Sequence, residues 1–178
     1  SIEFDNRITF IAPGSDTGGI DYTIGTNGSY LNVGGIESKG LELSASYMLN
    51  NEWNVYSSYT NNSSEYKGDA PGFEAGGKVI DSVDDLFVLS TDYYSGDFRF
   101  GLSAKYTGER GDVDSYTVLD LNAGYAAEVN AGPFKAVDIA FVVYNITDKS
   151  YLAGGTGNGS TYFIGSPRTA AVTLTATF

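Results

Sequence analysis

Cysteine and histidine are both absent from this chain of 178 residues. Without cysteine there is no disulfide framework and no thiolate that could act as a nucleophile. Without histidine the chain lacks the commonest general base and the commonest transition-metal ligand, and a Ser-His-Asp triad cannot form. We therefore expect a protein that is not an enzyme, with no catalytic residue, no metal site and no cofactor.

Positive charge and long apolar runs are also scarce. Ten lysines and arginines stand against 22 aspartates and glutamates, which gives a formal net charge of -12. Nucleic acid is excluded as a partner, because its phosphates need a basic surface. The richest apolar stretch, Ile139 to Tyr144, is far shorter than the roughly 18 residues that identify a membrane-spanning helix. A helical membrane protein is therefore excluded as well.

Alternation of apolar and polar residues is the main feature that the chain does have. In the last ten residues, the even positions from Ala170 to Phe178 are apolar, whereas the odd positions from Thr169 to Thr177 are threonine or alanine. A period of two indicates a β-strand with two unlike faces. Soluble chains tend to end in loose, solvated residues. A transmembrane β-barrel can end on an apolar strand, because lipid covers one face.

Similar stretches recur along the chain and predict about eight strands in total. Besides the terminal strand they cover residues 2–10, 41–49, 53–59, 87–93, 98–106, 119–125 and 137–143. Aromatic residues are abundant, with 14 tyrosines and 10 phenylalanines. Several of them flank aliphatic residues on the apolar face, as in the column from Phe98 to Tyr106. Such columns are typical of the two aromatic girdles of a membrane barrel.

Turn residues between these stretches predict antiparallel hairpins. Ser95-Gly96 can close a two-residue turn, which would place Tyr93 opposite Phe98. At 50–52 a loop of three residues is needed, because a shorter one would turn Trp53 away from the apolar face.

The other connections are much longer than these turns. Residues 13–29, 67–85 and 154–168 are rich in glycine, aspartate, asparagine and serine, and 108–115 is a shorter connection at the same end. Soluble β-sandwiches usually have connections of more even length. We therefore predict an all-β fold: an antiparallel transmembrane β-barrel segment of about eight strands, with short periplasmic turns and long extracellular loops.

Four stretches resemble motifs of one known family. They are Gly35-Ile-Glu-Ser-Lys-Gly-Leu-Glu-Leu43, Ser115-Tyr-Thr-Val-Leu-Asp-Leu121, Asn145-Ile-Thr-Asp-Lys-Ser-Tyr151 and Tyr162-Phe-Ile-Gly-Ser-Pro-Arg168. In order and approximate spacing, the chain is similar to the C-terminal β-barrel portion of a TonB-dependent outer-membrane receptor, of the siderophore-receptor type. The likeness extends over 1–178, within which no plug domain and no TonB box is recognisable.

This resemblance implies a location in the bacterial outer membrane and a role in TonB-dependent uptake. The ligand would be a scarce small molecule such as a ferric siderophore, and this chain would supply the C-terminal barrel wall and loops. The expected partners are outer-membrane lipid, the remaining strands and plug of the same receptor, TonB, and the barrel assembly machinery. The assembly signal would fall on Phe178, with Val172 and Leu174 on the same face.

Four residues near the predicted extracellular ends are the expected ligand contacts: Tyr66, Arg110, Tyr162 and Arg168. Aromatic and arginine side chains suit anionic, ring-bearing ligands. The plain alternative is that the tyrosines belong to the girdle and that Arg168 braces the wall against a plug.

Other polar clusters are interpreted as solvated surface loops. Asp81, Asp84 and Asp85 lack the spacing of a calcium-binding EF-hand. The glycine-rich stretch 154–160 lacks the lysine and the following helix of a phosphate-binding loop.

Two other functions stay open on the sequence alone. One is a complete small outer-membrane barrel with a structural or adhesive role, and the other is a soluble all-β binding module. A small closed barrel must fill its lumen with side chains, whereas the predicted inward set is small: Ser44, Gly101, Ser103, Gly124 and Ala126. The small residues favour a wide lumen that something else fills.

Overall fold

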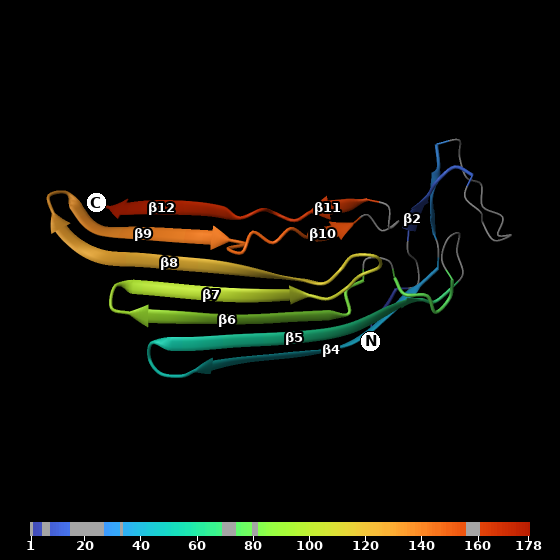
Figure 1. Ribbon diagram of the computed structural model, residues 1–178, viewed down its shortest axis with the longest axis horizontal. Coiled ribbons are helices and arrows are strands. Elements are labelled where there is room, and N and C mark those ends of the chain that lie inside the picture. The colour runs from blue at the N-terminus through green and yellow to red at the C-terminus, as the bar shows by residue number, and fades with distance from the viewer. Residues whose placement is uncertain are drawn as a thin grey trace.

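The computed structural model describes residues 2–4, 8–14, 27–32, 34–68, 74–79, 82–155 and 161–178. These residues form strands and connections (Figure 1). None of them belongs to a helix with the length and apolar character that a bilayer crossing requires.

One antiparallel sheet of eight strands makes up the body of the fold. In sheet order its strands are β1 (Ile2–Phe4), β4 (Ile36–Met48), β5 (Trp53–Tyr66), β6 (Asp85–Ser95), β7 (Phe98–Thr107), β8 (Tyr116–Ala131), β9 (Phe134–Tyr144) and β12 (Thr169–Thr177). Strands β1 and β12 are the two edges and do not pair with each other. The sheet is therefore open, and the described residues do not form the closed eight-stranded barrel of the first alternative.

Two small hairpins stand apart from this sheet. One pairs β2 (Ile8–Ile11) with β3 (Ser29–Asn32), and the other pairs β10 (Leu152–Gly155) with β11 (Tyr162–Ile164). Both lie at the end of the molecule that carries the long connections, on the right in Figure 1. The prediction of one strand over 2–10 was wrong, because 8–11 leaves the main sheet and pairs locally with 29–32, where no strand was predicted.

The turn between β6 and β7 has a register that differs from the predicted one. Ser95 lies opposite Phe98, so the turn residues are Gly96 and Asp97, and Tyr93 faces Phe100 instead of Phe98. Gly96 has a φ of 57°, which the first central residue of a tight hairpin turn requires. A shift of two residues keeps every side chain on its predicted face, so the error changes the pairing but not the orientation.

The turn between β4 and β5 is the predicted three-residue loop. The side-chain oxygen of Asn50 accepts hydrogen bonds from the N–H groups of Glu52 and Trp53, each at 2.8 Å. The N–H of Leu49 donates to the carbonyl oxygen of Trp53 at 2.9 Å. This local network is the usual way in which an asparagine side chain closes a turn. It keeps Trp53 on the apolar face.

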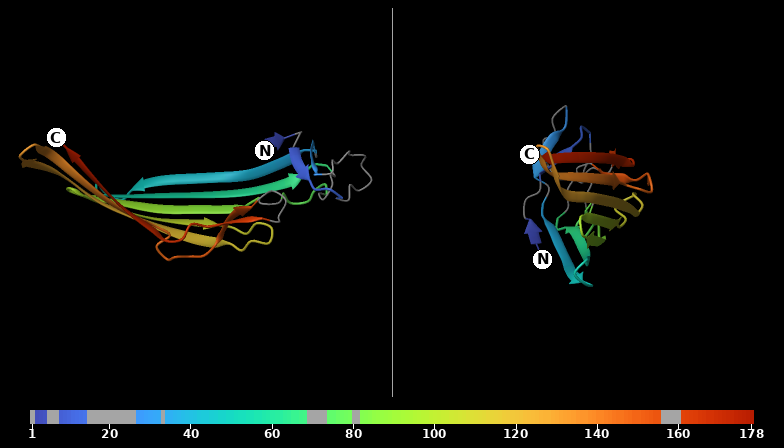
Figure 2. Two further views of the ribbon diagram at one scale, coloured as in Figure 1. Left: turned by 90° about the horizontal axis from the view of Figure 1, so that it is seen from above. Right: turned by 90° about the vertical axis from the view of Figure 1, so that its left-hand side faces the viewer.

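The apolar face of the sheet is uncovered. Leu41, Leu43, Val172 and Leu174 are 56%, 57%, 68% and 68% exposed, respectively, and both views of Figure 2 show the sheet as a single curved layer. In a soluble sandwich a second sheet would bury these side chains. A row of exposed leucine and valine that follows the strand period is what lipid contact requires, and it argues against the soluble module.

Aromatic pairs border this apolar face near the short turns. Trp53 and Tyr93 have ring centroids 4.7 Å apart, and those of Phe98 and Tyr125 are 4.8 Å apart. Six residues above Trp53, Tyr59 begins a second aromatic row, with Phe87 and then Tyr106 opposite it in register. At about 3.3 Å per residue the two rows lie about 20 Å apart along a strand, close to the apolar band of about 25 Å in membrane barrels.

The opposite face carries small and polar residues, as predicted for a lumen wall. Its strongest contact is the ion pair of Arg99 with Asp138, in which two N–H groups donate to the two carboxylate oxygens at 2.8 Å each. The pair joins β7 to β9 across β8, and Gly124 lies beneath the Arg99 side chain. A Cβ atom at Gly124 would lie 2.5 Å from Cζ of Arg99. Glycine at this position is therefore what allows the ion pair to cross the strand.

Candidate functional site

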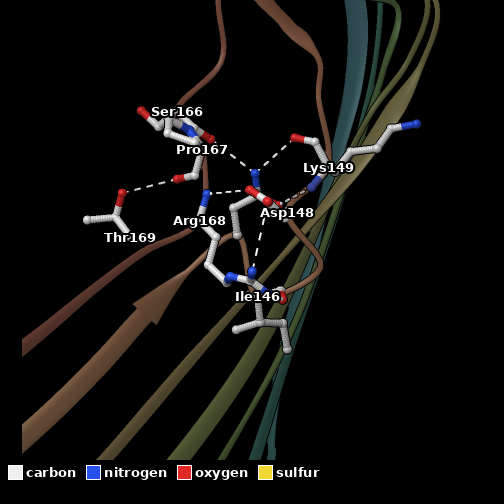
Figure 3. A network of polar contacts seen from close by, with 8 residues as sticks. Ile146, Asp148, Lys149, Ser166, Pro167, Arg168 and Thr169 are labelled. Atoms are coloured by element: carbon white, nitrogen blue, oxygen red, sulfur yellow. Dashed lines mark hydrogen bonds and ion pairs between the residues drawn. The ribbon is translucent and has the colours of Figure 1, made fainter.

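The connection from β9 to β12 begins at Asn145, and its residues Asn145, Ile146 and Tyr151 contact β8. Asn145 has a φ of 50°, a conformation that asparagine tolerates better than most residues. Its side chain is 2% exposed. The amide nitrogen Nδ2 donates to the carbonyl oxygens of Lys149 and Ser166 at 2.9 and 3.0 Å, and Oδ1 accepts the N–H of Lys149 at 2.9 Å. One side chain thus joins the first and last parts of the connection. Figure 3 shows Lys149 and Ser166, the two residues that it joins, beside Asp148 and Arg168.

Asp148 and Arg168 make a second link between the same two parts. The carboxylate of Asp148 accepts the N–H of Arg168 at 2.9 Å, and the Arg168 guanidinium lies 3.9 Å from that carboxylate. Asp148 also has a positive φ, 52°, and its N–H donates to the carbonyl oxygen of Asn145 at 2.9 Å. We call residues 145–149 and 166–168 together the Asn145 clasp. The clasp leads directly into β12 and so fixes where the last strand starts.

Tyr151 is enclosed between a ring on the wall and a backbone on the connection. Its ring stacks on Tyr116 of β8, with centroids 4.3 Å apart and an angle of 30° between the planes. On the side of Gly165, a Cβ atom would lie within 2.5 Å of three carbons of the Tyr151 ring. The N–H of Gly165 also donates to the carbonyl oxygen of Tyr151 at 2.8 Å. Position 165 therefore has room only for glycine, because a side chain there would overlap the Tyr151 ring.

Two cavities open beside Tyr151. The one we call the mouth cavity has a volume of ≈ 230 Å³ and is lined by Asp112, Val113, Asp114, Ser115, Tyr116, Lys149, Ser150, Tyr151 and Leu152. A second cavity, of ≈ 340 Å³, is lined by Val118, Asp120, Tyr144, Asn145, Tyr151, Ser166 and Thr169. Tyrosine rings with a few polar groups around them suit the binding of a small molecule by stacking and hydrogen bonding. In the described part of the chain, no group of three or more His, Cys, Asp or Glu residues is placed to hold a metal ion.

Two of the predicted ligand contacts lie at the β10–β11 hairpin. Arg110 is 8% exposed and donates from Nη2 to the carbonyl oxygen of Leu152 at 2.7 Å, so it ties the β7–β8 connection to β10. Tyr162 is half-buried in β11, opposite Gly155 of β10. The structure therefore brings these two residues to the same small hairpin.

The other two predicted contacts have different surroundings. Arg168 belongs to the Asn145 clasp, at the base of the same connection. Tyr66 is 4% exposed at the end of β5, where its N–H donates to the carbonyl oxygen of Gly77 at 2.9 Å and its Cα pairs with Ile36. Tyr66 thus belongs to a separate group of contacts.

The acidic cluster and the glycine-rich stretch are only partly described. Asp84 accepts a hydrogen bond from the ammonium of Lys78 at 2.7 Å, and Asp85 accepts one from the hydroxyl of Tyr59 at 2.6 Å. Asp81 lies outside the described residues, as do 156–160 of the glycine-rich stretch. Two of the three carboxylates therefore have protein partners.

Four residues of this site were not among the predicted contacts: Asn145, Tyr116, Tyr151 and Gly165. The signal for them was present, because all four fall within the stretches that carry the family resemblance. Those stretches carried the resemblance, and only Tyr162 and Arg168 among their residues were predicted to have a role of their own. The hydrogen bond from Asn145 to Ser166 spans 21 positions of sequence, and no local pattern reveals a contact over that distance.

The predicted assembly residues lie at the C-terminal edge of the sheet. Val172 and Leu174 point to the apolar face, and the ring centroid of Phe178 lies 5.0 Å from that of Phe134. Phe178 itself is 68% exposed. This placement leaves an apolar edge strand accessible, while the assembly role stays a prediction.

Comparison with known proteins gives one family and several similar folds. The family described as TonB dependent receptor-like, beta-barrel, matches residues 1–146. No curated protein matches the chain. The ferric-catecholate import receptor Fiu from K12 E. coli is 21% identical with a TM-score of 0.62, over 97% of this chain and 23% of that one.

Two further structures have the same fold. BauA, the ferric preacinetobactin receptor from Acinetobacter baumannii, is 15% identical with a TM-score of 0.71, over 96% of this chain and 26% of that one. The copper transporter OprC is 17% identical with a TM-score of 0.69, over 99% of this chain and 27% of that one. The chain thus spans about a quarter of the length of each of these three structures.

Proposed function

The chain belongs to the TonB-dependent receptor β-barrel family, and on that basis we propose that it forms the C-terminal barrel wall of an uptake receptor. It is an antiparallel barrel segment of the bacterial outer membrane. The function we propose is the uptake of a scarce small molecule, with a ferric siderophore as the ligand class. No bond is made or broken in such a role, and energy would come through TonB.

The observation that carries this proposal is that the sheet has both an uncovered apolar face and two open edges. In hydrocarbon, each unpaired backbone N–H or C=O group costs several kcal/mol. Among the described residues, β1 covers β4 only at Ile36–Ser38, so the free edges of β4 and β12 call for further strands. Together with small residues on the lumenal face, such as Gly101 and Gly124, this arrangement supports a wide barrel that holds a plug.

We place the ligand at the mouth cavity, between the β7–β8 and β9–β12 connections. Tyr116 and Tyr151 offer stacked rings there, and Tyr162 lies in the hairpin that continues the same wall. Aromatic rings and hydroxyl groups suit the planar chelating groups of an iron carrier. The four contacts expected from sequence, Tyr66, Arg110, Tyr162 and Arg168, stay part of the proposal.

The proposal also includes the partners that such a receptor needs. Outer-membrane lipid would cover the apolar face, and the remaining strands and the plug would complete the pore. TonB would act on another part of the receptor. The barrel assembly machinery would act on β12, where Val172, Leu174 and Phe178 are exposed.

Uptake of radioactive iron tests the proposal directly. A strain that lacks this receptor is compared with one that carries it, using 55Fe-loaded catecholate and hydroxamate siderophores as probes. We expect at least one probe to enter only when both the receptor and TonB are present. Replacing Tyr116 and Tyr151 together by alanine should weaken binding of that probe, measured on cells without energy supply.

Two results would contradict the proposal. One is receptor-dependent uptake that persists without TonB. The other is a complete panel of siderophores whose uptake is the same with and without the receptor. The matched control is Asn51→Asp, which changes an exposed residue of a turn at the opposite end of the wall.

A further inference from the structure

We infer that residues 145–152, the first part of the β9–β12 connection, form a fixed wall of the mouth, and that Asn145 is the positioning residue that keeps them there. On this view these residues do not close over the ligand as a lid. The inference rests on the proposed uptake function as far as the ligand is concerned. Its structural part, that residues 145–152 are immobile, stands independently.

The first argument is that Asn145 uses its polar groups completely on the connection. Both Nδ2 hydrogens are donated to carbonyl oxygens, of Lys149 and Ser166, and Oδ1 accepts the N–H of Lys149. The side chain is 2% exposed, so no water competes freely for these bonds. A lid movement would leave buried polar groups without partners, which is costly.

The second argument is that the clasp is attached to the barrel wall. The N–H of Asn145 donates to the carboxylate of Asp120 at 2.8 Å, and the N–H of Ile146 donates to the carbonyl oxygen of Leu119 at 2.8 Å. Both acceptors belong to β8, where they pair with Ser103 and Ala104 of β7, and the pairing of β8 with β9 begins at the next residue, Leu121. The clasp is thus anchored in a strand of the sheet and not in another loop.

The third argument is that the far side of the connection is anchored as well. Tyr151 is fixed between Tyr116 and Gly165. Arg110, which comes from the neighbouring connection, donates to the carbonyl oxygen of Leu152 at 2.7 Å. Residues 145–152 are therefore held at their start and at their end. The mouth cavity is preformed, and opening or closing would have to occur elsewhere in the receptor.

A nitroxide spin label at Ser150 tests this inference in the complete receptor. Ser150 is exposed and lines the mouth cavity, and this chain has no cysteine, so Ser150→Cys gives a defined label once any cysteines elsewhere in the receptor are replaced. Electron paramagnetic resonance spectra are recorded in outer membranes. We expect an immobilised spectrum at Ser150 without ligand, and the same spectrum with any siderophore that the receptor binds.

Asn145→Asp is the diagnostic substitution. Aspartate also tolerates a positive φ and keeps one oxygen for the N–H of Lys149, but it turns a carboxylate oxygen toward the carbonyl oxygens of Lys149 and Ser166. We expect the label to become mobile and siderophore binding to weaken about tenfold or more, with the transport rate at saturating ligand unchanged per folded receptor. Asn51→Asp, an exposed turn residue, should leave both the spectrum and the binding as they are.

The outcomes separate the two proposals. A mobile label in the unsubstituted receptor, or a spectrum that Asn145→Asp leaves unchanged, would overturn the fixed wall. Failure to bind any siderophore would contradict the proposed function alone, because the spectra need no ligand. If Asn145→Asp does not assemble, Asn145→Gly replaces it, since glycine adopts the positive φ of this position and removes the side-chain bonds of the clasp. An immobilised label in this second variant would also overturn the inference.

Discussion

Replacing Gly165 by alanine should loosen the β9–β12 connection without altering the barrel. The added Cβ would lie within 2.5 Å of three ring carbons of Tyr151, whereas ordinary contacts begin at 3.4 Å. The ring would therefore have to move by about 1 Å. It cannot move away freely, because Tyr116 stacks on it with centroids 4.3 Å apart.

The magnitude follows from these two contacts. Inserting a methyl group into a packed site costs about 1–3 kcal/mol, and a lost aromatic pair costs about 0.5–1.5 kcal/mol. We expect a local destabilisation of about 2 kcal/mol, which raises the population of the opened connection about thirtyfold. Global unfolding of the barrel should change much less, because the eight-stranded sheet contains neither Gly165 nor Tyr151.

Gly154→Ala is the matched control in the same connection. A Cβ atom at Gly154 would lie 3.8 Å from Nη1 of Arg110 and 3.8 Å from the ring of Phe163, which are ordinary contacts. Alanine there should be neutral or stabilising by about 0.4–1 kcal/mol, because it restricts the unfolded chain.

Limited proteolysis with trypsin measures the difference. Lys149 lies inside the Asn145 clasp, and its peptide bond is cleaved only when the connection opens. Cleavage after Lys149, followed by mass spectrometry on receptor in detergent, should be about thirtyfold faster in Gly165→Ala and no faster in Gly154→Ala. Equal rates in Gly165→Ala and the unsubstituted receptor would refute the packing argument, as would equal acceleration by both substitutions.

Three further predictions concern the wall itself. Gly124→Ala should displace Arg99 from Asp138, so it and Arg99→Ala should lower the thermal transition by the same amount and not additively; additive losses would argue against a shared ion pair. Deleting Phe178 should reduce the folded, heat-modifiable band in outer membranes, and an undiminished band would count against the assembly role. Fluorescence from Trp53, isolated as the difference from Trp53→Phe, should be quenched more by nitroxide lipids labelled near the head group than by those labelled at mid-chain, and the reverse order would place the girdle wrongly.

The main sheet could be predicted from sequence because lipid and lumen impose opposite demands on alternate residues. The alternation from Ala170 to Phe178 therefore identified a strand and its faces without any tertiary information. The registers of the strand pairs were harder to predict. Pairing at 50–52 followed from the need to keep Trp53 on the apolar face, whereas pairing after Ser95 depended on which residue takes a positive φ, and that residue is Gly96.

The site was predictable only in outline. Residue type directed attention to Arg110 and Arg168, and the structure shows that Arg110 contacts the β9–β12 connection and that Arg168 belongs to it. Sequence offered no means of knowing that they donate to the chain itself, because their partners Leu152 and Asp148 are distant or unremarkable in sequence. The asparagine at the centre of the clasp was missed for a similar reason: a buried amide is recognised by its partners, and those come together only in the fold.

A wall one sheet thick has no interior in which side chains of both faces pack together. Neighbouring residues therefore face different surroundings, lipid on one side and the lumen on the other. Leu89 faces the lipid. Ser90, the next residue, faces the lumen and pairs with Ser103 of the neighbouring strand. Substitutions at the lumen-facing residues, which are every second position, could therefore change the polar groups that line the pore without changing the residues that contact lipid. Such a barrel can acquire a new cargo by changing one face and keep its place in the membrane through the other.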